Sequence, residues 1–412
     1  MTPEIPSAPE SSNHMRLTRG MIALFSFCCG AIVANLYYAQ PIIALIAPEM
    51  YMTPGTASLI VSLTQVGYAL GMFFLVPLGD LVENRRLMLT TALISVVALA
   101  AASTAHHAAT FLLVSLVLGF STVTVQILVP LAAHMAPDET RGQAVGTIMG
   151  GLLLGILLAR PISSFIAGHF GWRAVYWAAT ALMTGVTALL AVTMPTRRPA
   201  HKASYWQLIR SLGNLIVTMK VLRHRALYQA LMFASFSLFW TTVPLELMRH
   251  YGLSQSGVAL FALVGAIGAT SAPIAGRLAD AGFSKLGTFV ALVVGTLSFV
   301  PNLIEGGFGV GGLLVTGVVL DFATQMNLVI GQREILALDS LSRNRLTAIY
   351  FTSIFLGGAL GSAISSGIYE TGGWRLSASV ASLFPALALA HFLSTIRFRR
   401  SGQLAATAHS EK

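Results

Sequence analysis

The sequence predicts an all-α polytopic membrane protein with twelve transmembrane helices in two parallel six-helix repeats. Three observations predict this fold class: the scarcity of charge, the spacing of the apolar runs and an internal repeat. Of the 412 residues, 55% are hydrophobic and 10% are charged, whereas an average soluble domain has about 25% charged residues. So few charges could not cover a soluble protein of this length. The same composition excludes a disordered chain and a disulfide scaffold.

The apolar runs justify the helix count, because a membrane-crossing helix needs about 20 residues. Twelve runs are predicted, at residues 20–46, 56–79, 87–105, 109–134, 143–167, 172–194, 226–247, 255–275, 286–304, 308–332, 346–368 and 374–396. The predicted domains are a disordered cytoplasmic segment 1–15, a six-helix half 16–194, a cytoplasmic linker 195–225, a second half 226–398 and a cytoplasmic tail 399–412.

The basic residues predict the orientation of these helices. With the amino terminus in the cytoplasm, 21 of the 25 Lys and Arg residues lie on the cytoplasmic side. Arg173, Arg249 and Arg375 then lie outside, and Arg160 lies within a span. The reverse orientation would break the positive-inside rule. We therefore expect both termini in the cytoplasm, a bacterial inner membrane location, and a net charge of +10 that reflects topology and not nucleic-acid binding.

An internal repeat supports the two halves. Sliding the sequence by 202 residues aligns residues 141–173 with residues 343–375 without a gap, and 11 of the 33 positions are identical. The triplet Gly171-Trp172-Arg173 matches the triplet at residues 373–375 in the corresponding loop. Parallel repeats related by an axis along the membrane normal are typical of two-half secondary transporters.

Three segments carry a resemblance to a known family. The loop after the second span reads PLGDLVENRR at residues 77–86, the loop after the eighth span reads GRLAD at residues 276–280, and the first span contains NLYYAQP at residues 35–41. Together with the twelve spans, they resemble the major facilitator superfamily. The first-span segment is similar to the branch of bacterial sugar-efflux and drug:proton antiport permeases. The resemblance covers essentially the whole chain and implies this family's twelve-helix fold.

The sequence also departs from the family's patterns. The signature loop has Leu81 at its first basic position and Glu83 at its second glycine. Drug:proton antiporters carry an Arg four residues before a glycine in the fourth span, and here Ser115 stands at that place before Gly119. The resemblance therefore implies the family's fold, but it implies neither the usual proton-coupling Arg nor a drug specificity for this chain.

The sequence carries no pattern of an enzyme. It has no phosphate-binding loop with Lys and Ser or Thr, no cluster with metal-ligand spacing, and no nucleophile–base set. We expect no cofactor and no metal, with a proton as the coupling ion. An ionisable side chain within a span is costly and marks a function by default. Arg160, in the outer half of the fifth span, is a candidate anion anchor or gating partner. Asp321, in the middle of the tenth span, is the candidate proton carrier, and Glu246 is a weaker one.

Further polar and aromatic side chains within the spans are candidates for the substrate and proton pathway, although each could equally serve helix packing. They are Asn35, Tyr38, Gln65, Gln126, Trp240 and Gln325. In the family, the first, fourth, seventh and tenth spans line the central cavity. The resemblance also implies an inner gate of ion pairs formed by Asp80, Arg85, Arg86 and Asp280. Such exposed pairs are worth about 0–1 kcal/mol each, which suits a contact that breaks in every cycle.

Glycines recur every four residues in the fifth span, at Gly142, Gly146 and Gly150, and in the eleventh, at Gly357 and Gly361. Small residues at this spacing let helices approach closely. We expect these faces to be sliding seams between the two halves.

The predicted function is secondary active transport by alternating access, with proton-coupled export of a small organic solute, either anionic or sugar-like. Two alternatives stay open: proton-coupled uptake or uniport of a nutrient such as a sugar or organic anion, and a non-transporting membrane sensor. The expected partners are a small-molecule substrate and the lipid bilayer, with no nucleic acid, and the expected state is a monomer.

Overall fold

The regular elements in the described part of the chain are helices. The computed structural model describes residues 18–137, 140–196, 204–265, 271–304, 308–339 and 342–410. The first half contains α1 (Arg19–Ala34), η1 (Gln40–Ile42), α2 (Ile43–Glu49), α3 (Pro54–Phe74), η2 (Pro77–Asp80), α4 (Asn84–Thr104), α5 (Ala108–Ser121), α6 (Thr124–Met135), α7 (Arg141–Phe170) and α8 (Trp172–Thr193). After α9 (Tyr205–Thr218) come α10 (Lys220–Arg249), α11 (Gln255–Gly265), α12 (Ser271–Asp280), α13 (Ser284–Leu297), α14 (Val300–Leu303), α15 (Gly309–Leu336) and α16 (Arg343–Ser410).

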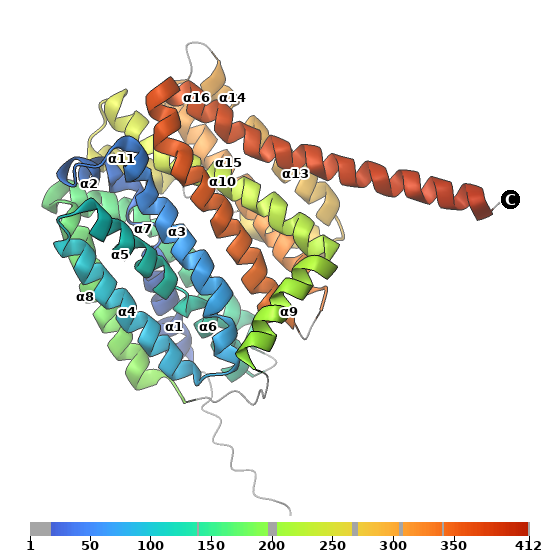
Figure 1. The fold of residues 1–412 in the computed structure, drawn as a ribbon, viewed down its shortest axis with the longest axis horizontal. Coiled ribbons are helices and arrows are strands. Elements are labelled where there is room, and N and C mark those ends of the chain that lie inside the picture. Colours follow the sequence, from blue (N-terminus) through green and yellow to red (C-terminus); the bar gives the residue numbers. More distant parts are fainter. Residues whose placement is uncertain are drawn as a thin grey trace, which may run out of the picture.

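These helices are consistent with the twelve predicted spans over the described ranges. Within the described ranges, nine stretches are long and apolar enough to cross a membrane, and α1 and residues 255–264 are shorter apolar helices. The last stretch passes through non-helical backbone at Gly372 and Gly373, so α16 supplies two spans. The predicted helical membrane fold is therefore confirmed. The helices of the first half lie together on the left of Figure 1, beside those of the second half.

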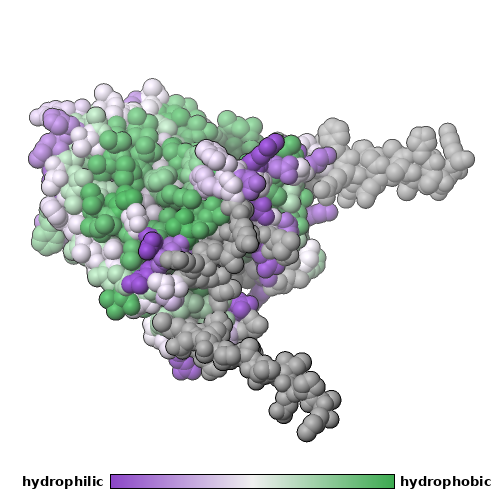
Figure 2. All heavy atoms as spheres, turned by 60° about the horizontal axis from the view of Figure 1, so that its bottom comes forward, coloured by the Kyte–Doolittle hydropathy of each residue, from purple (hydrophilic) through white to green (hydrophobic). Residues whose placement is uncertain are grey.

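Large apolar side chains are exposed on helices of both halves. Val97 and Leu113 are each 62% exposed in the first half, and Leu297 is 56% exposed in the second. In Figure 2 such residues form a broad hydrophobic area on the face shown, with hydrophilic residues toward its margins. A soluble monomer rarely exposes an apolar patch of this extent, whereas the hydrocarbon core of a bilayer accepts it.

The internal repeat appears in the backbone as well as in the sequence. Gly171 separates α7 from α8 with a φ of +82°, and Gly373, which lies 202 residues later, turns the chain inside α16 with a φ of +60°. Only glycine adopts this left-handed region at little steric cost. The same turn therefore joins the fifth and sixth spans of each half.

The prediction that the glycine faces are seams between the halves is wrong. Gly357 and Gly361 pack against α10 of their own half, and a Cβ on the face of Gly142, Gly146 and Gly150 would meet no described atom within 4 Å. A side chain at Gly155 would meet Gly30 of α1, and one at Gly357 would meet Ala230 of α10. The spacing did indicate close helix packing, but the close partner belongs to the same half.

The two halves meet along other pairs of helices, of which α3 with α16 and α7 with α11 have the most extensive contacts. Serine side chains of α3 bond to carbonyl oxygens of α16. The Ser62 Oγ donates to Ala359 O at 2.9 Å, and the Ser58 Oγ donates to Ala363 O at 3.0 Å. These contacts hold α3 against the second half without any charged group.

The predicted linker contains α9, which marks one end of the bundle. Its Tyr205 Oη donates to Phe74 O at 3.0 Å, and its Ser211 Oγ accepts from Arg345 of α16 at 3.0 Å. The second half begins its first long helix at Lys220, so part of the predicted linker belongs to α10. We call the end near α9 the linker end, and the end near η1 the opposite end.

Candidate functional site

A cavity of about 390 Å³ lies between the two halves. It is lined by α1, α3, α6 and α7 of the first half and by α10, α15 and α16 of the second. Its lining extends to Asn84 and Asn344, close to the first residues of α4 and α16 at the linker end. At its inner limit lie Tyr37 and Phe236. The cavity therefore reaches from the middle of the bundle toward the linker end.

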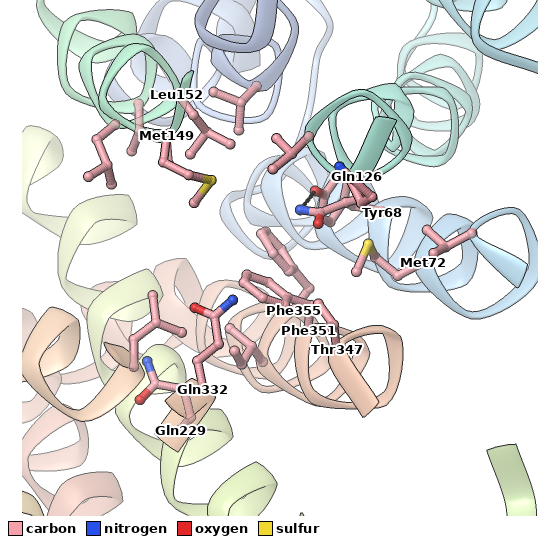
Figure 3. A pocket seen from close by; sticks show the side chains of 18 of the residues that line it. Tyr68, Met72, Gln126, Met149, Leu152, Gln229, Gln332, Thr347, Phe351 and Phe355 are labelled. Atoms are coloured by element: carbon pink, nitrogen blue, oxygen red, sulfur yellow. Dashed lines mark hydrogen bonds between the residues drawn. The ribbon is translucent and has the colours of Figure 1, made fainter. Parts of the chain in front are cut away.

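Polar groups face the cavity from both halves. Figure 3 shows Gln126 and Tyr68 on one side of it and Gln332 and Gln229 on the other. The Gln126 Nε2 donates to Tyr68 Oη at 3.1 Å, whereas Gln229 bonds within its own half, to Thr324 O and to the Asn327 amide. The lining thus contains both satisfied carboxamides and carboxamide groups that remain available to a ligand.

Arg160 and Asp321 come together next to the cavity, from opposite halves, and Trp240 of α10 joins them. The Trp240 Nε1–H donates to Asp321 Oδ1 at 2.8 Å, and the guanidinium of Arg160 lies 4.4 Å from the centroid of the Trp240 ring. Arg160 is 5% exposed and Asp321 is 8% exposed. Among the described side chains, Arg160 and Asp321 form no direct ion pair, and Trp240 contacts both of them. We call Arg160, Trp240 and Asp321 the charged cluster.

Aromatic rings of the cavity lining cover the guanidinium of Arg160. The Arg160 guanidinium lies 5.0 Å from the centroid of the Tyr37 ring and 5.1 Å from that of the Phe236 ring. Both rings line the cavity, whereas Arg160 and Asp321 do not. A guanidinium over aromatic faces gains cation–π stabilisation when it is removed from water. Its Nε also donates to Gln40 Oε1 at 2.8 Å, while its Nη2 has no hydrogen-bond partner among the described residues.

Beyond the charged cluster, polar contacts close the opposite end. The Gln255 Nε2 of α11 donates to Pro41 O at 2.7 Å and to Ser164 Oγ at 2.8 Å. The Ser164 hydroxyl in turn donates to the Gln255 carbonyl at 2.9 Å. Because Gln255 belongs to the second half and its partners to the first, these bonds fasten the halves together. The molecule is therefore closed at the opposite end and open at the linker end.

The remaining predicted pathway residues occupy different places. Gln325 and Gln126 line the cavity. Gln65 is buried and donates to Ser237 Oγ of the other half at 2.8 Å. Asn35 is buried, and neither of its amide atoms bonds to a residue that the structure describes. Tyr38 accepts a hydrogen bond from Ser163 at its backbone carbonyl.

The predicted inner-gate residues do not bridge the halves where their side chains are described. Arg85 donates to Ala191 O at 2.5 Å, and Arg86 forms a 3.1 Å ion pair with Glu83. All of these residues belong to the first half. The side chains of Asp80 and Asp280 lie outside the described part of the structure.

The sequence reasoning missed Tyr37, Gln255, Gln332 and Phe355. Gln332 follows Gln325 by seven residues, so their shared helix face was a usable signal. Tyr37 belongs to the NLYYAQP segment of the first span, whereas Gln255 and Phe355 are ordinary residues of apolar spans that no pattern marks.

Comparisons with known proteins agree with this architecture. The chain matches the family model of the Major Facilitator Superfamily over residues 22–335. The Uncharacterized transporter YgaY of Escherichia coli O157:H7 is 39% identical over 363 residues, which cover 88% of this chain and 92% of that protein. The Probable transporter SCO4007 of Streptomyces coelicolor is 31% identical over 358 residues, covering 86% of this chain and 83% of that protein.

Among solved structures, the nucleoside transporter NupG superimposes with a TM-score of 0.73 at 13% identity, over 90% of this chain and 99% of that one. At this identity the similarity concerns the fold alone. With the family model matched over most of the chain, the conclusion is plain: this protein belongs to the Major Facilitator Superfamily and is a membrane transporter of that family.

Proposed function

We propose that this protein is a proton-coupled exporter of a small organic solute that works by alternating access. The observation that carries the proposal is the charged cluster, in which Trp240 links Arg160 of one half to Asp321 of the other. A carboxylate and a guanidinium buried within a membrane bundle are costly, and such pairs mark ion and proton pathways. The cluster is thus the best place for a proton to act on the contact between the halves.

The proposed coupling follows from the charge of Asp321. While Asp321 is ionised, it balances Arg160 and accepts the Trp240 N–H. Protonation removes the negative charge and leaves Arg160 without a counter-charge at the interface between the halves. A buried pair that loses one charge is strongly destabilised. Proton binding would therefore weaken this arrangement and favour a rocking of the halves that opens the opposite end.

The proposed orientation places the linker end and both termini in the cytoplasm of a bacterium, with the chain in the inner membrane as a monomer. The cavity then loads solute from the cytoplasm, which suits export. When the linker end closes, Asp80, Arg85, Arg86 and Asp280 would form the inner gate. Arg85 and Arg86 would first have to leave their first-half partners.

The test is transport into proteoliposomes driven by an imposed pH gradient. The solute is the one that most stabilises the purified protein in a thermal-shift screen of drugs, sugars and organic anions. Asp321→Asn should abolish the response to the pH gradient while keeping the shape of the side chain. The matched control is Glu246→Gln, because Glu246 is also buried but accepts its hydrogen bond from Tyr369, within the second half.

Full gradient-driven transport by Asp321→Asn would contradict the coupling. Imposing the gradient in each direction separates export from uptake, and flux that does not depend on the gradient would indicate uniport. A chain that moves the selected solute under no gradient would contradict the export proposal and favour the alternative of a membrane sensor.

A further inference from the structure

The cavity is chemically neutral over its described lining. No Asp, Glu, Lys or Arg belongs to the described residues that line it, and the guanidinium of Arg160 lies against the rings of Tyr37 and Phe236. Burying a charge without a counter-charge carries a large desolvation penalty. An organic anion or cation in this cavity would meet that penalty with no opposite charge on the wall. The lining therefore favours an uncharged solute.

Aromatic rings from both halves form one continuous wall of the cavity. Tyr68 of the first half lies 4.4 Å from Phe355 of the second, measured between ring centroids, and Phe355 lies 5.2 Å from Phe233. Phe233 stacks on Phe236 with 5.1 Å between the centroids and 12° between the ring planes. Aromatic faces and edges arranged in this way attract a further flat ring.

Unpaired hydrogen-bonding groups stand opposite this wall and beside it. The carboxamides of Gln325 and Gln332 have no side-chain hydrogen bond to the described residues, and the Gln126 oxygen is likewise unpaired. The hydroxyl of Thr324, which also lines the cavity, is buried and has no hydrogen-bond partner in the described part of the chain. A carboxamide offers two donors and an acceptor that carries no charge. The buried Thr324 hydroxyl calls for a ligand or water to satisfy it, and the half-buried carboxamides of Gln126, Gln325 and Gln332 are accessible to the same ligand.

We propose that the solute is an uncharged, flat aromatic or heteroaromatic molecule that carries an amide-like hydrogen-bonding group. Its ring would lie against Phe355 and Phe233, and its polar group would bond to the carboxamides of Gln126 and Gln332, one from each half. This inference rests on the proposed transport function and names its substrate class. The cavity volume of about 390 Å³ suits one small ligand. A sugar is disfavoured because its many hydroxyls would face a mostly apolar lining.

Binding of matched probes to the full-length protein in lipid nanodiscs tests this class, by calorimetry and without any pH gradient. The first pair is indole-3-acetamide and indole-3-acetate, the second is benzamide and benzoate, and D-glucose represents sugars. We expect each amide to bind at least about tenfold more tightly than its carboxylate. Tighter binding of a carboxylate or of glucose would overturn the proposal. So would the absence of amide binding at millimolar concentration.

Variants locate the binding in this cavity. Phe355→Ala and Gln332→Leu should each weaken indole-3-acetamide about tenfold or more, whereas Phe27→Ala, at a side chain that is 54% exposed on α1, should not. Gln332→Lys adds a positive charge and should reverse the preference toward indole-3-acetate. Unchanged binding in both Gln332 variants would overturn the assignment, even if Phe355→Ala fails to fold. Because no gradient is used, this test can fail while proton coupling through Asp321 stands, and the reverse also holds.

Discussion

The cavity and the charged cluster share two aromatic rings but differ in every other respect. Tyr37 and Phe236 line the cavity and also contact Arg160. On the cavity side, the described groups are apolar, aromatic or neutral and polar. On the other side, the guanidinium of Arg160 and the carboxyl group of Asp321 are buried around Trp240. The difference teaches that one protein can select a solute and respond to a proton in adjacent but separate places.

Among the variants that distinguish the cavity from the charged cluster, Arg160→Gln is expected to have the largest effect on transport. Removing one member of a buried charge pair costs about 3–5 kcal/mol, so pH-gradient-driven transport should fall at least about 100-fold. Binding of the neutral probe should stay within about threefold, because Arg160 does not line the cavity. Arg160→Lys should be intermediate, since it keeps the charge but loses the planar fork. Equal losses of transport and probe binding would show that the two places are one site.

A second prediction concerns how α7 is held so that Arg160 reaches Tyr37. A Cβ added at Gly155 would collide with the backbone of Gly30, whereas Gly150 has nothing within 4 Å of its Cβ position. Overpacking costs about 1–3 kcal/mol, so Gly155→Ala should lower the melting temperature of the purified protein clearly. Gly150→Ala is the matched control and should leave it unchanged. Equal melting temperatures of Gly155→Ala and Gly150→Ala would show that the close contact of α1 and α7 does not contribute to stability.

A third prediction concerns the closed end that protects the charged cluster. Gln255→Leu removes the hydrogen bonds to Pro41 O and to Ser164 Oγ. Each buried bond contributes about 1 kcal/mol, so the population open at the opposite end should rise about 5- to 150-fold.

Spin labels at Tyr51→Cys and His250→Cys, on the two halves at this end, would report the change as longer distances. The native Cys28 and Cys29 are replaced in this background. Gln143→Leu, at an exposed glutamine near the start of α7, should leave the distances unaltered. A distance distribution that does not respond to Gln255→Leu would mean that other contacts close this end.

The smallest effect is expected for an ion pair at the surface, in contrast to the buried one. Arg173 donates a hydrogen bond to Glu49, and this contact holds the pKa of Glu49 below its ordinary value of 4.5. The pair therefore stabilises the fold above about pH 4.5, and this stabilisation is lost as the pH falls through the lowered pKa. Because the Glu49 side chain is 51% exposed, Glu49→Gln should cost under about 1 kcal/mol. Thermal melts of the wild type and Glu49→Gln at neutral and acid pH would measure this cost. A stability difference between the two proteins that grows toward acid pH would contradict the prediction.

Much of the fold could be predicted because apolar run length and charge location follow directly from the physics of the bilayer. The shift of 202 residues located the turn at Gly171 and its counterpart at Gly373. The glycine spacing indicated close packing but could not name the partner helix. That choice depends on which helices of a half lie side by side.

The candidate site could be predicted only as single residues. Arg160 and Asp321 stand out in the sequence because charges within spans are rare. Their approach through Trp240 depends on the crossing of three helices, and no sequence pattern encodes such a crossing. The roles of Tyr37 and Phe355 were hidden for a related reason, since an aromatic residue in an apolar span looks the same whether it faces lipid, core or cavity.

The central claim is that Asp321 takes up the transported proton while the cavity remains neutral. Infrared difference spectroscopy of the full-length protein in nanodiscs, taken from alkaline to acid pH, tests it most directly. We predict a carbonyl band of a buried, protonated carboxylic acid that is present in the wild type and in Glu246→Gln and absent from Asp321→Asn. A band that persists in Asp321→Asn would contradict the account.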